Sequence, residues 1–160
     1  MGTRSITHLS LVRDGVKTRI VSLYRHYDGY PEGHGLQMSE FLAGFPGKED
    51  KQPSYAERKI GNSHNGADDL MFQLIAVLKM ESGPANFYLT APGQHGMGEE
   101  YTYDICFDDE TAEATIRIIP GYPQADAFVG SPQELIKRFG KKEEDQKEPV
   151  PQEYEDGVGY

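Results

Sequence analysis

The chain of 160 residues has 37% hydrophobic and 11% aromatic residues, a composition typical of a soluble globular domain with a core of its own. No apolar run approaches the ~20 residues of a membrane span, and residues 1–5 lack the apolar region of a signal peptide. The single Cys excludes an internal disulfide and is typical of a reducing compartment. We therefore expect a cytoplasmic protein with no membrane partner.

The net charge of −10 is unevenly distributed along the chain. Residues 1–27 hold five Arg or Lys against Asp14 alone, whereas residues 141–160 hold three Lys against seven acids. Duplex DNA is bound mainly through cationic contacts to phosphate, so the acidic whole argues against duplex nucleic acid as a partner. The basic N-terminal segment is predicted to be a solvated strand face or to hold a small anion.

The first elements in chain order are two strands. Residues 5–12 are rich in β-branched and aliphatic side chains, and Asp14-Gly15 supply the turn chemistry of a hairpin. Residues 16–27 continue as a second, longer strand with apolar side chains on both faces. This pattern predicts a β-hairpin whose second strand lies inside a sheet.

Two helices follow the hairpin. Pro31 is suited to the first position of a helix, and apolar residues at helical spacing extend that helix to residue 45. Residues 48–65 are polar and predict a loop. A broad apolar stripe predicts a second helix that ends at residue 82. Its N-cap is expected at Asn62, Ser63 or Asn65.

Residues 86–91, 100–108 and 112–119 alternate as three strands and predict a meander. The loop between the first two carries Gly93, Gly96 and Gly98. These glycines precede a strand, whereas phosphate-binding glycine loops precede a helix. A flexible hairpin loop is the favoured interpretation, and a loop that closes over a ligand is the alternative.

Residues 131–139 begin with a capping box and predict a short helix. The order of elements predicts an α+β fold, a two-layer sandwich in which two helices cover a mainly antiparallel sheet of about five strands. Residues 1–140 are expected to form one domain. Residues 141–160 are charged and poor in apolar groups, which predicts an acidic, disordered tail.

Polar and aromatic side chains are densest in residues 24–35, where the second strand gives way to the first helix. Arg side chains match phosphate, Tyr rings stack on bases, and backbone N–H groups freed by glycines at a helix start can bind an anion. We therefore expect a ligand-binding corner for a small anion of the nucleotide class. The predicted ligand-binding residues are Arg4, Tyr24, Arg25, His26, Asp28, Tyr30, Gly33, His34 and Gly35.

The same corner also holds residue types that could bind a metal or catalyse a reaction. His26, Asp28 and His34 are ligand types for zinc or iron, but they lack a paired metal-binding spacing. A His–Asp hydrogen bond that pins the turn is the favoured alternative. Glu32 with His34 could serve acid–base catalysis, and Cys106 lies mid-strand as inert packing. We predict no catalytic residue, no metal and no cofactor.

Residues 2–5, Gly2-Thr3-Arg4-Ser5, and the Y-R-H-Y-D-G-Y-P-E-G-H-G of residues 24–35 resemble a family of small bacteriophage and bacterial proteins. That family begins G-T-R-S and carries a Y-R-x-x-D-G-Y-P-x-G-H-G motif. Residues 128–134 also resemble its closing segment. The long motif is a specific label for the family, but it implies no particular activity.

An association with phages favours a non-enzymatic, homo-oligomeric sponge that sequesters a nucleotide or cyclic-nucleotide immune signal in the host cytoplasm. The basic hairpin and the glycine-opened helix support this hypothesis. One alternative is an acidic inhibitor that binds a host protein through its negative surface. The other is a small metal-dependent or nucleotide-processing enzyme.

Overall fold

The computed structural model describes residues 2–123 and 126–141. Its strands are β1 (Ser5–Arg13), β2 (Val16–Arg25), β3 (Phe87–Thr90), β4 (Tyr101–Asp108), β5 (Ala114–Pro120) and β6 (Phe128–Gly130). They form one sheet in the order β3-β2-β1-β4-β5-β6, in which only β1 and β4 run parallel among the described strands. The predicted acidic tail, residues 141–160, lies outside the described residues except for Lys141.

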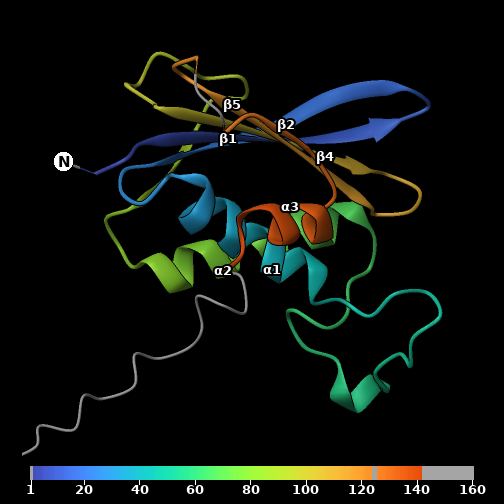
Figure 1. The fold of residues 1–160 in the computed structure, drawn as a ribbon. Coiled ribbons are helices and arrows are strands. Elements are labelled where there is room, and N and C mark those ends of the chain that lie inside the picture. Colours follow the sequence, from blue (N-terminus) through green and yellow to red (C-terminus); the bar gives the residue numbers. More distant parts are fainter. Residues whose placement is uncertain (1, 124–125, 142–160) are drawn as a thin grey trace, which may run out of the picture.

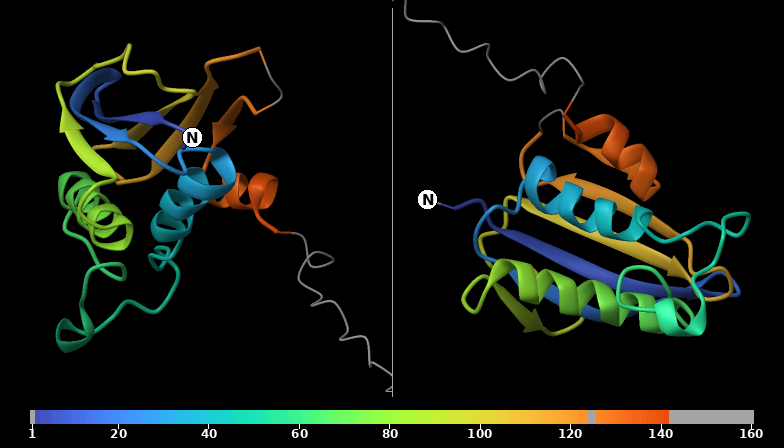
Figure 2. Two further views of the ribbon diagram at one scale, coloured as in Figure 1. Left: turned by 90° about the vertical axis from the view of Figure 1, so that its left-hand side faces the viewer. Right: turned by 90° about the horizontal axis from the view of Figure 1, so that it is seen from below.

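Three α-helices pack on one face of this sheet (Figures 1 and 2). They are α1 (Leu36–Ala43), α2 (Ala67–Ser82) and α3 (Pro132–Phe139), and a π-helical turn, Pro31–Gly35, precedes α1. The α+β fold and the short C-terminal helix are therefore confirmed. The helix-free side of the sheet is called the open face below. No helix of the described residues is long and apolar enough to cross a membrane.

Two local predictions are wrong. The predicted meander fails because β3 pairs with β2 at the edge of the sheet, whereas β4 pairs with β1. Alternation identifies a strand but does not identify its neighbour. The N-cap of α2 is Gly66, with φ 98°, and the Asp69 carboxylate instead accepts the N–H of Asn65 at 2.7 Å. The sixth strand, β6, spans three residues, too few to show alternation.

The core lies between the sheet and the helices. Side chains from alternate positions of the strands point toward the helices, and they include Leu9, Leu23, Ile105 and Ile116, all buried. The helices supply Met38, Leu74 and Leu135, which are also buried. Burial of these apolar side chains supplies most of the free energy that holds the sheet and the helices together.

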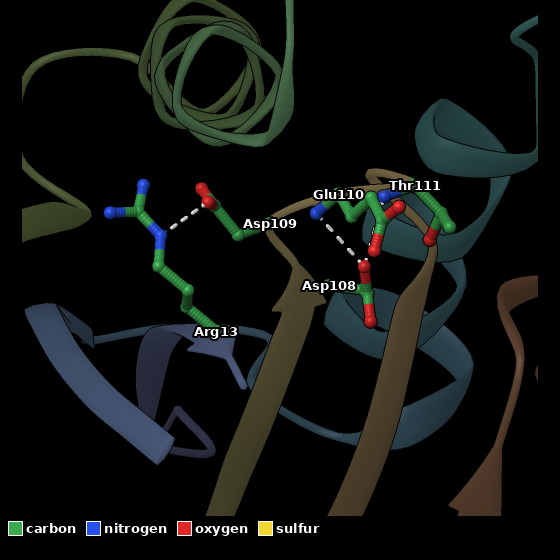
Figure 3. Close-up of polar contacts among 5 residues, drawn as sticks. All are labelled: Arg13, Asp108, Asp109, Glu110 and Thr111. Carbon is green, nitrogen blue, oxygen red and sulfur yellow. Dashed lines mark hydrogen bonds and ion pairs between the residues drawn. The ribbon is translucent and has the colours of Figure 1, made fainter. Parts of the chain in front are cut away.

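The ends of β1 and β4 are held together by polar contacts, which Figure 3 shows. The Arg13 guanidinium lies 2.7 Å from the Asp109 carboxylate, and the Asp109 N–H donates to the carbonyl of Val12 at 2.9 Å. The Asp108 carboxylate accepts the backbone N–H groups of Glu110 and Thr111, each at 2.9 Å. This closes the turn after β4 and fixes where the parallel pair ends.

The capping box of α3 is confirmed, and its contribution to stability can be tested. The Ser131 hydroxyl accepts the N–H of Glu134 at 3.1 Å. Ser131→Ala should therefore lower the free energy of unfolding by about 1 kcal/mol in urea titrations. Ser54→Ala, at an exposed capping box outside the core, should cost less. Equal costs for the two variants would contradict the account.

Candidate functional site

The predicted corner is a chain reversal packed against β1 and β4. Asp28 has a positive φ of 58°. The next residue, Gly29, lies so close to β1 that a Cβ on it would be 2.7 Å from the Cβ of Ser5. The Tyr103 hydroxyl donates to the carbonyl of Gly29 at 2.7 Å. The backbone of the corner is thus fixed by its own sheet.

The imidazole of His34 lies inside the protein and is fully buried. Its Nδ1 is 3.1 Å from Nη1 of Arg25, and its Nε2 is 2.7 Å from the hydroxyl of Thr7. Because a guanidinium can only donate, Nδ1 accepts, and Nε2 carries the proton and donates to Thr7. Burial, followed by the positive charge of Arg25, lowers the pKa of His34 well below its usual value. His34 is therefore a neutral structural group.

The guanidinium of Arg25 is also buried and bonded within the protein. Its Nε donates to the carbonyl of Tyr27 at 2.5 Å, its Nη1 also donates to Gln37 at 2.8 Å, and its guanidinium lies 4.9 Å from the ring centre of Phe87. Burial lowers the pKa of Arg25. A phosphate could reach this guanidinium only by displacing these contacts.

The remaining predicted residues do not converge on one opening. Tyr24 is buried, and its hydroxyl lies 2.8 Å from Nδ1 of the half-buried His26. Arg4, Asp28 and Tyr30 are exposed. The structure therefore separates the seven predicted residues other than glycine into an interior group and scattered surface positions.

The two glycines of the corner allow close packing within the chain. A Cβ on Gly33 would lie 3.0 Å from the carbonyl oxygen of Asp28, and one on Gly35 would lie 3.4 Å from the ring of Tyr103. The N–H groups of Gly33 and His34 both donate to the carbonyl of Tyr30, at 3.0 and 2.9 Å. These amides are therefore already bonded and do not form an empty anion site.

The metal interpretation of the corner also finds no geometric support. Both ring nitrogens of His34 are bonded, and the described residues contain no group of three or more side chains placed to hold a metal. The expected His–Asp hydrogen bond is not found within the described ranges either. His34 pins the turn instead, through Thr7 and Arg25.

A cavity of about 310 Å³ lies beside the corner, between the π-helical turn, α1 and the end of α2. Its charged lining residues are Glu32, Glu40 and Glu81, and none is a cation. Three carboxylates repel an anionic ligand. The corner is thus a poor site for a nucleotide on this side.

Polar side chains instead gather on the open face. Strand pairing places Thr90, Ser22, His8, Asp104 and Arg117 in one row across the sheet. The neighbouring row holds Arg19, Ser10, Cys106 and Thr115. Asp104 is the one acid of these two rows, and its carboxylate accepts from Lys17 at 2.5 Å.

The loop of residues 91–100 runs over this face, on the side opposite the helices (Figure 1). It must do so because β3 and β4 are separated in the sheet by β2 and β1. The predicted flexible hairpin loop is therefore a crossover. The Gly93 N–H donates to the hydroxyl of Ser22 at 2.9 Å, and the Glu100 N–H donates to the carbonyl of Arg4 at 2.9 Å.

Two glycines of the crossover lie directly against arginines. A Cβ on Gly93 would lie 3.2 Å from Nη1 of Arg19, and one on Gly98 would lie 2.8 Å from Nη1 of Arg4. Both glycines have positive φ, 81° and 78°, which other residues rarely adopt. The loop therefore needs glycine to pass over these guanidinium groups.

His8 and Ser22 form a closed pair under the loop. The Ser22 hydroxyl accepts the N–H of Gly93 at 2.9 Å and shares a hydrogen bond with Nδ1 of His8, 2.6 Å away. Burial, followed by the charge of Arg19, lowers the pKa of His8, and Asp104 opposes that shift. Ser22 is fully buried. The hydroxyl is therefore bonded on two sides and closed off from the surface.

The thiol of Cys106 is not activated either, because burial, followed by the charge of Asp104, raises its pKa.

Three arginines of the open face, Arg4, Arg19 and Arg117, are exposed. No side chain of the described residues forms a hydrogen bond or an ion pair with their guanidinium groups. The open face thus presents three exposed cations, whereas His8 and Ser22 lie buried beneath the crossover. Sequence reasoning missed His8, Arg19 and Arg117, although the alternation of residues 102–108 already separated a polar face.

No protein-family model matches the chain, and no curated protein or solved structure matches it either.

The neutral state of His34 makes stability depend on pH. The unfolded chain takes up a proton on this imidazole below its usual pKa of 6.5, whereas the folded chain does not. Stability should therefore fall as the pH drops below 6.5, by ~1.4 kcal/mol per pH unit from this group. His34→Ala should cost about 3 kcal/mol at pH 7.5 in urea titrations, since it leaves a cavity and unpaired partners.

His34→Ala should also remove that share of the pH dependence. Tyr103→Phe is the matched control, since it deletes the bond to Gly29 at a cost of about 1 kcal/mol and leaves His34 in place. Its pH slope should equal that of the wild type. An unchanged slope in His34→Ala would show that His34 is not the neutral, buried group described above.

Proposed function

We propose that the protein is a non-enzymatic binding protein for a small anionic ligand of the nucleotide class, and that the ligand binds on the open face beside the 91–100 crossover. The observation that carries the proposal is the set of free guanidinium groups of Arg4, Arg19 and Arg117 on one face of a chain of net charge −10. The one acid among them, Asp104, is already neutralised by Lys17.

The dimensions of the open face suit a nucleotide. Adjacent strands lie ~4.8 Å apart, so the three spacings from β2 to β5 cover roughly 14 Å. Arg19 and Arg117 stand on these two strands on either side of His8 and Asp104. A guanidinium fork binds phosphate through two parallel hydrogen bonds, so two forks at this spacing fit separate phosphate groups or the two ends of one nucleotide.

The aromatic side chain of Tyr88 lies at the edge of this face, where its hydroxyl donates to the carbonyl of Ala85 at 3.1 Å and Nζ of Lys79 lies 5.7 Å from its ring centre. Tyr88 pairs with Tyr24 across β3 and β2, is 49% exposed, and has its ring centre 6.1 Å from that of Tyr24. Rings of this kind offer a stacking surface for a base. Cations and a ring can hold a nucleotide. Because the Ser22 hydroxyl is buried and bonded and the pKa of the Cys106 thiol is raised, these features favour binding of the nucleotide over its chemical conversion.

In the host cytoplasm of a phage infection, such a protein would act as a sponge for a nucleotide or cyclic-nucleotide signal. The resemblance of residues 24–35 to a phage family supports this setting, and the open face supplies the chemistry. The acidic inhibitor of a host protein is the alternative, and the acidic cavity beside α1 and α2 favours it.

Thermal-shift screening against mono-, di- and cyclic nucleotides tests the proposal. A ligand at 100 times its Kd should add ~2.7 kcal/mol of stability. Arg19→Ala and Arg117→Ala should each weaken binding about 10- to 100-fold, since each removes charge-assisted hydrogen bonds. Arg13→Ala removes the same charge at an exposed ion pair beyond the rows and should leave binding unchanged.

Tyr30→Ala provides the second control, because it alters the exposed side of the corner without touching the open face. If Tyr30→Ala abolishes binding and Arg19→Ala does not, the ligand binds at the corner of residues 24–35 and not on the open face. No shift with any nucleotide, together with pull-down of one host protein, would favour the inhibitor hypothesis.

A further inference from the structure

Residues 46–65 form an arm that projects from the body of the protein (Figures 1 and 2). Its tip, residues 54–60, includes the single-turn helix Tyr55–Glu57 and is exposed throughout. Tyr55 is 88% exposed and Ile60 is 59% exposed. Exposed apolar side chains that stand together on a surface mark interaction sites, and both of these belong to the tip.

The tip holds its shape through its own hydrogen bonds, and the base of the arm is attached to the body. The N–H of Glu57 donates to the carbonyl of Ser54 at 2.9 Å, and the amide of Asn62 bridges the tip by accepting from Lys59 at 2.9 Å and donating to Glu57 at 3.0 Å. Gln73 of α2 clamps the base, accepting from Gly61 at 3.0 Å. The tip is therefore preorganised, which lowers the entropy lost when it binds.

A cavity of about 1010 Å³ lies next to the base of the arm. One wall is the end of α1 with the arm base, and the other is the β4–β5 turn with the start of α3. Its apolar lining includes Leu42, Phe45 and Leu70, and its acids are Glu113 and Glu134. No residue of the tip lines it, so the chain does not fill its own cavity.

The tip and the cavity are complementary in charge and in polarity. The tip carries two cations, Arg58 and Lys59, against one acid, Glu57. The guanidinium of Arg58 lies 5.8 Å from the ring centre of Tyr55. The cavity pairs its two acids with an apolar floor. Its one cation, Lys48, belongs to the arm base.

We propose that the arm tip of one copy inserts into this cavity of a second copy, and that the exchange is reciprocal. Arm and cavity are neighbours in one molecule, so a two-fold axis beside them satisfies both contacts at once and closes the assembly as a dimer. Two insertions double the buried area toward the ~1,600 Å² of a stable interface. The open face lies on the other side of the sheet and stays free for its ligand.

Cross-linking tests the insertion directly. In a Cys106→Ser background, Ala56→Cys on the tip and Gln133→Cys in the cavity are purified separately, mixed and oxidised. The mixture should give a covalent dimer at least tenfold faster than either variant alone. Phe72→Cys, exposed on α2, replaces Ala56→Cys as the control and should give no such excess. Equal rates in the two mixtures would overturn the proposal.

Sedimentation velocity of the full chain gives the independent measure. The wild type should sediment as a dimer, Tyr55→Ser with Ile60→Ser should sediment as a monomer, and Arg58→Glu should weaken the dimer about tenfold. Glu113→Arg should restore the Arg58→Glu dimer. A monomeric wild type, or a dimer that survives the tip changes, contradicts arm exchange. The monomeric variant, Tyr55→Ser with Ile60→Ser, should still be stabilised by a nucleotide in thermal-shift assays. Loss of the dimer and loss of the nucleotide site can therefore be told apart.

Discussion

The parallel pairing of β1 with β4 is the constraint on which the rest of the structure depends. It puts β1 in the middle of the sheet and forces the chain to travel from β3 at one edge, over β2 and β1, to reach β4. The crossover can take only the open face, because the helices occupy the other (Figure 2). Its passage buries His8 and Ser22, and it brings glycine backbone against Arg4 and Arg19. The candidate site is therefore a consequence of the topology.

Elements with local causes were predictable from the sequence. The hairpin follows from Asp14-Gly15, and α3 follows from its capping box. The partner of β3 and the route of residues 91–100 were not predictable, because both depend on contacts between distant segments. A four-residue strand carries no signal that distinguishes β2 from β4 as its neighbour.

The same distinction explains the candidate site. Residues 24–35 are dense in polar groups because they build a buried turn, in which Arg25 and His34 satisfy each other and are completed by Thr7 and Gln37. Local sequence cannot show that Thr7 reaches His34 from 27 residues away. Free cations of the open face, by contrast, come from the residue before β1, from β2 and from β5, and only the sheet brings them to one face. Acidic side chains gather in the cavity beside the corner, so the two sides of the molecule differ in charge.

Arginine side-chain signals in NMR test the central claim most directly, because they report each guanidinium separately. Titration of the isotope-labelled protein with a nucleotide that stabilises it should shift the Nε–Hε resonances of Arg19 and Arg117 and leave that of Arg25 in place. Shifts confined to Arg25 and the amides of residues 28–35, with Arg19 and Arg117 unmoved, would contradict a binding site on the open face.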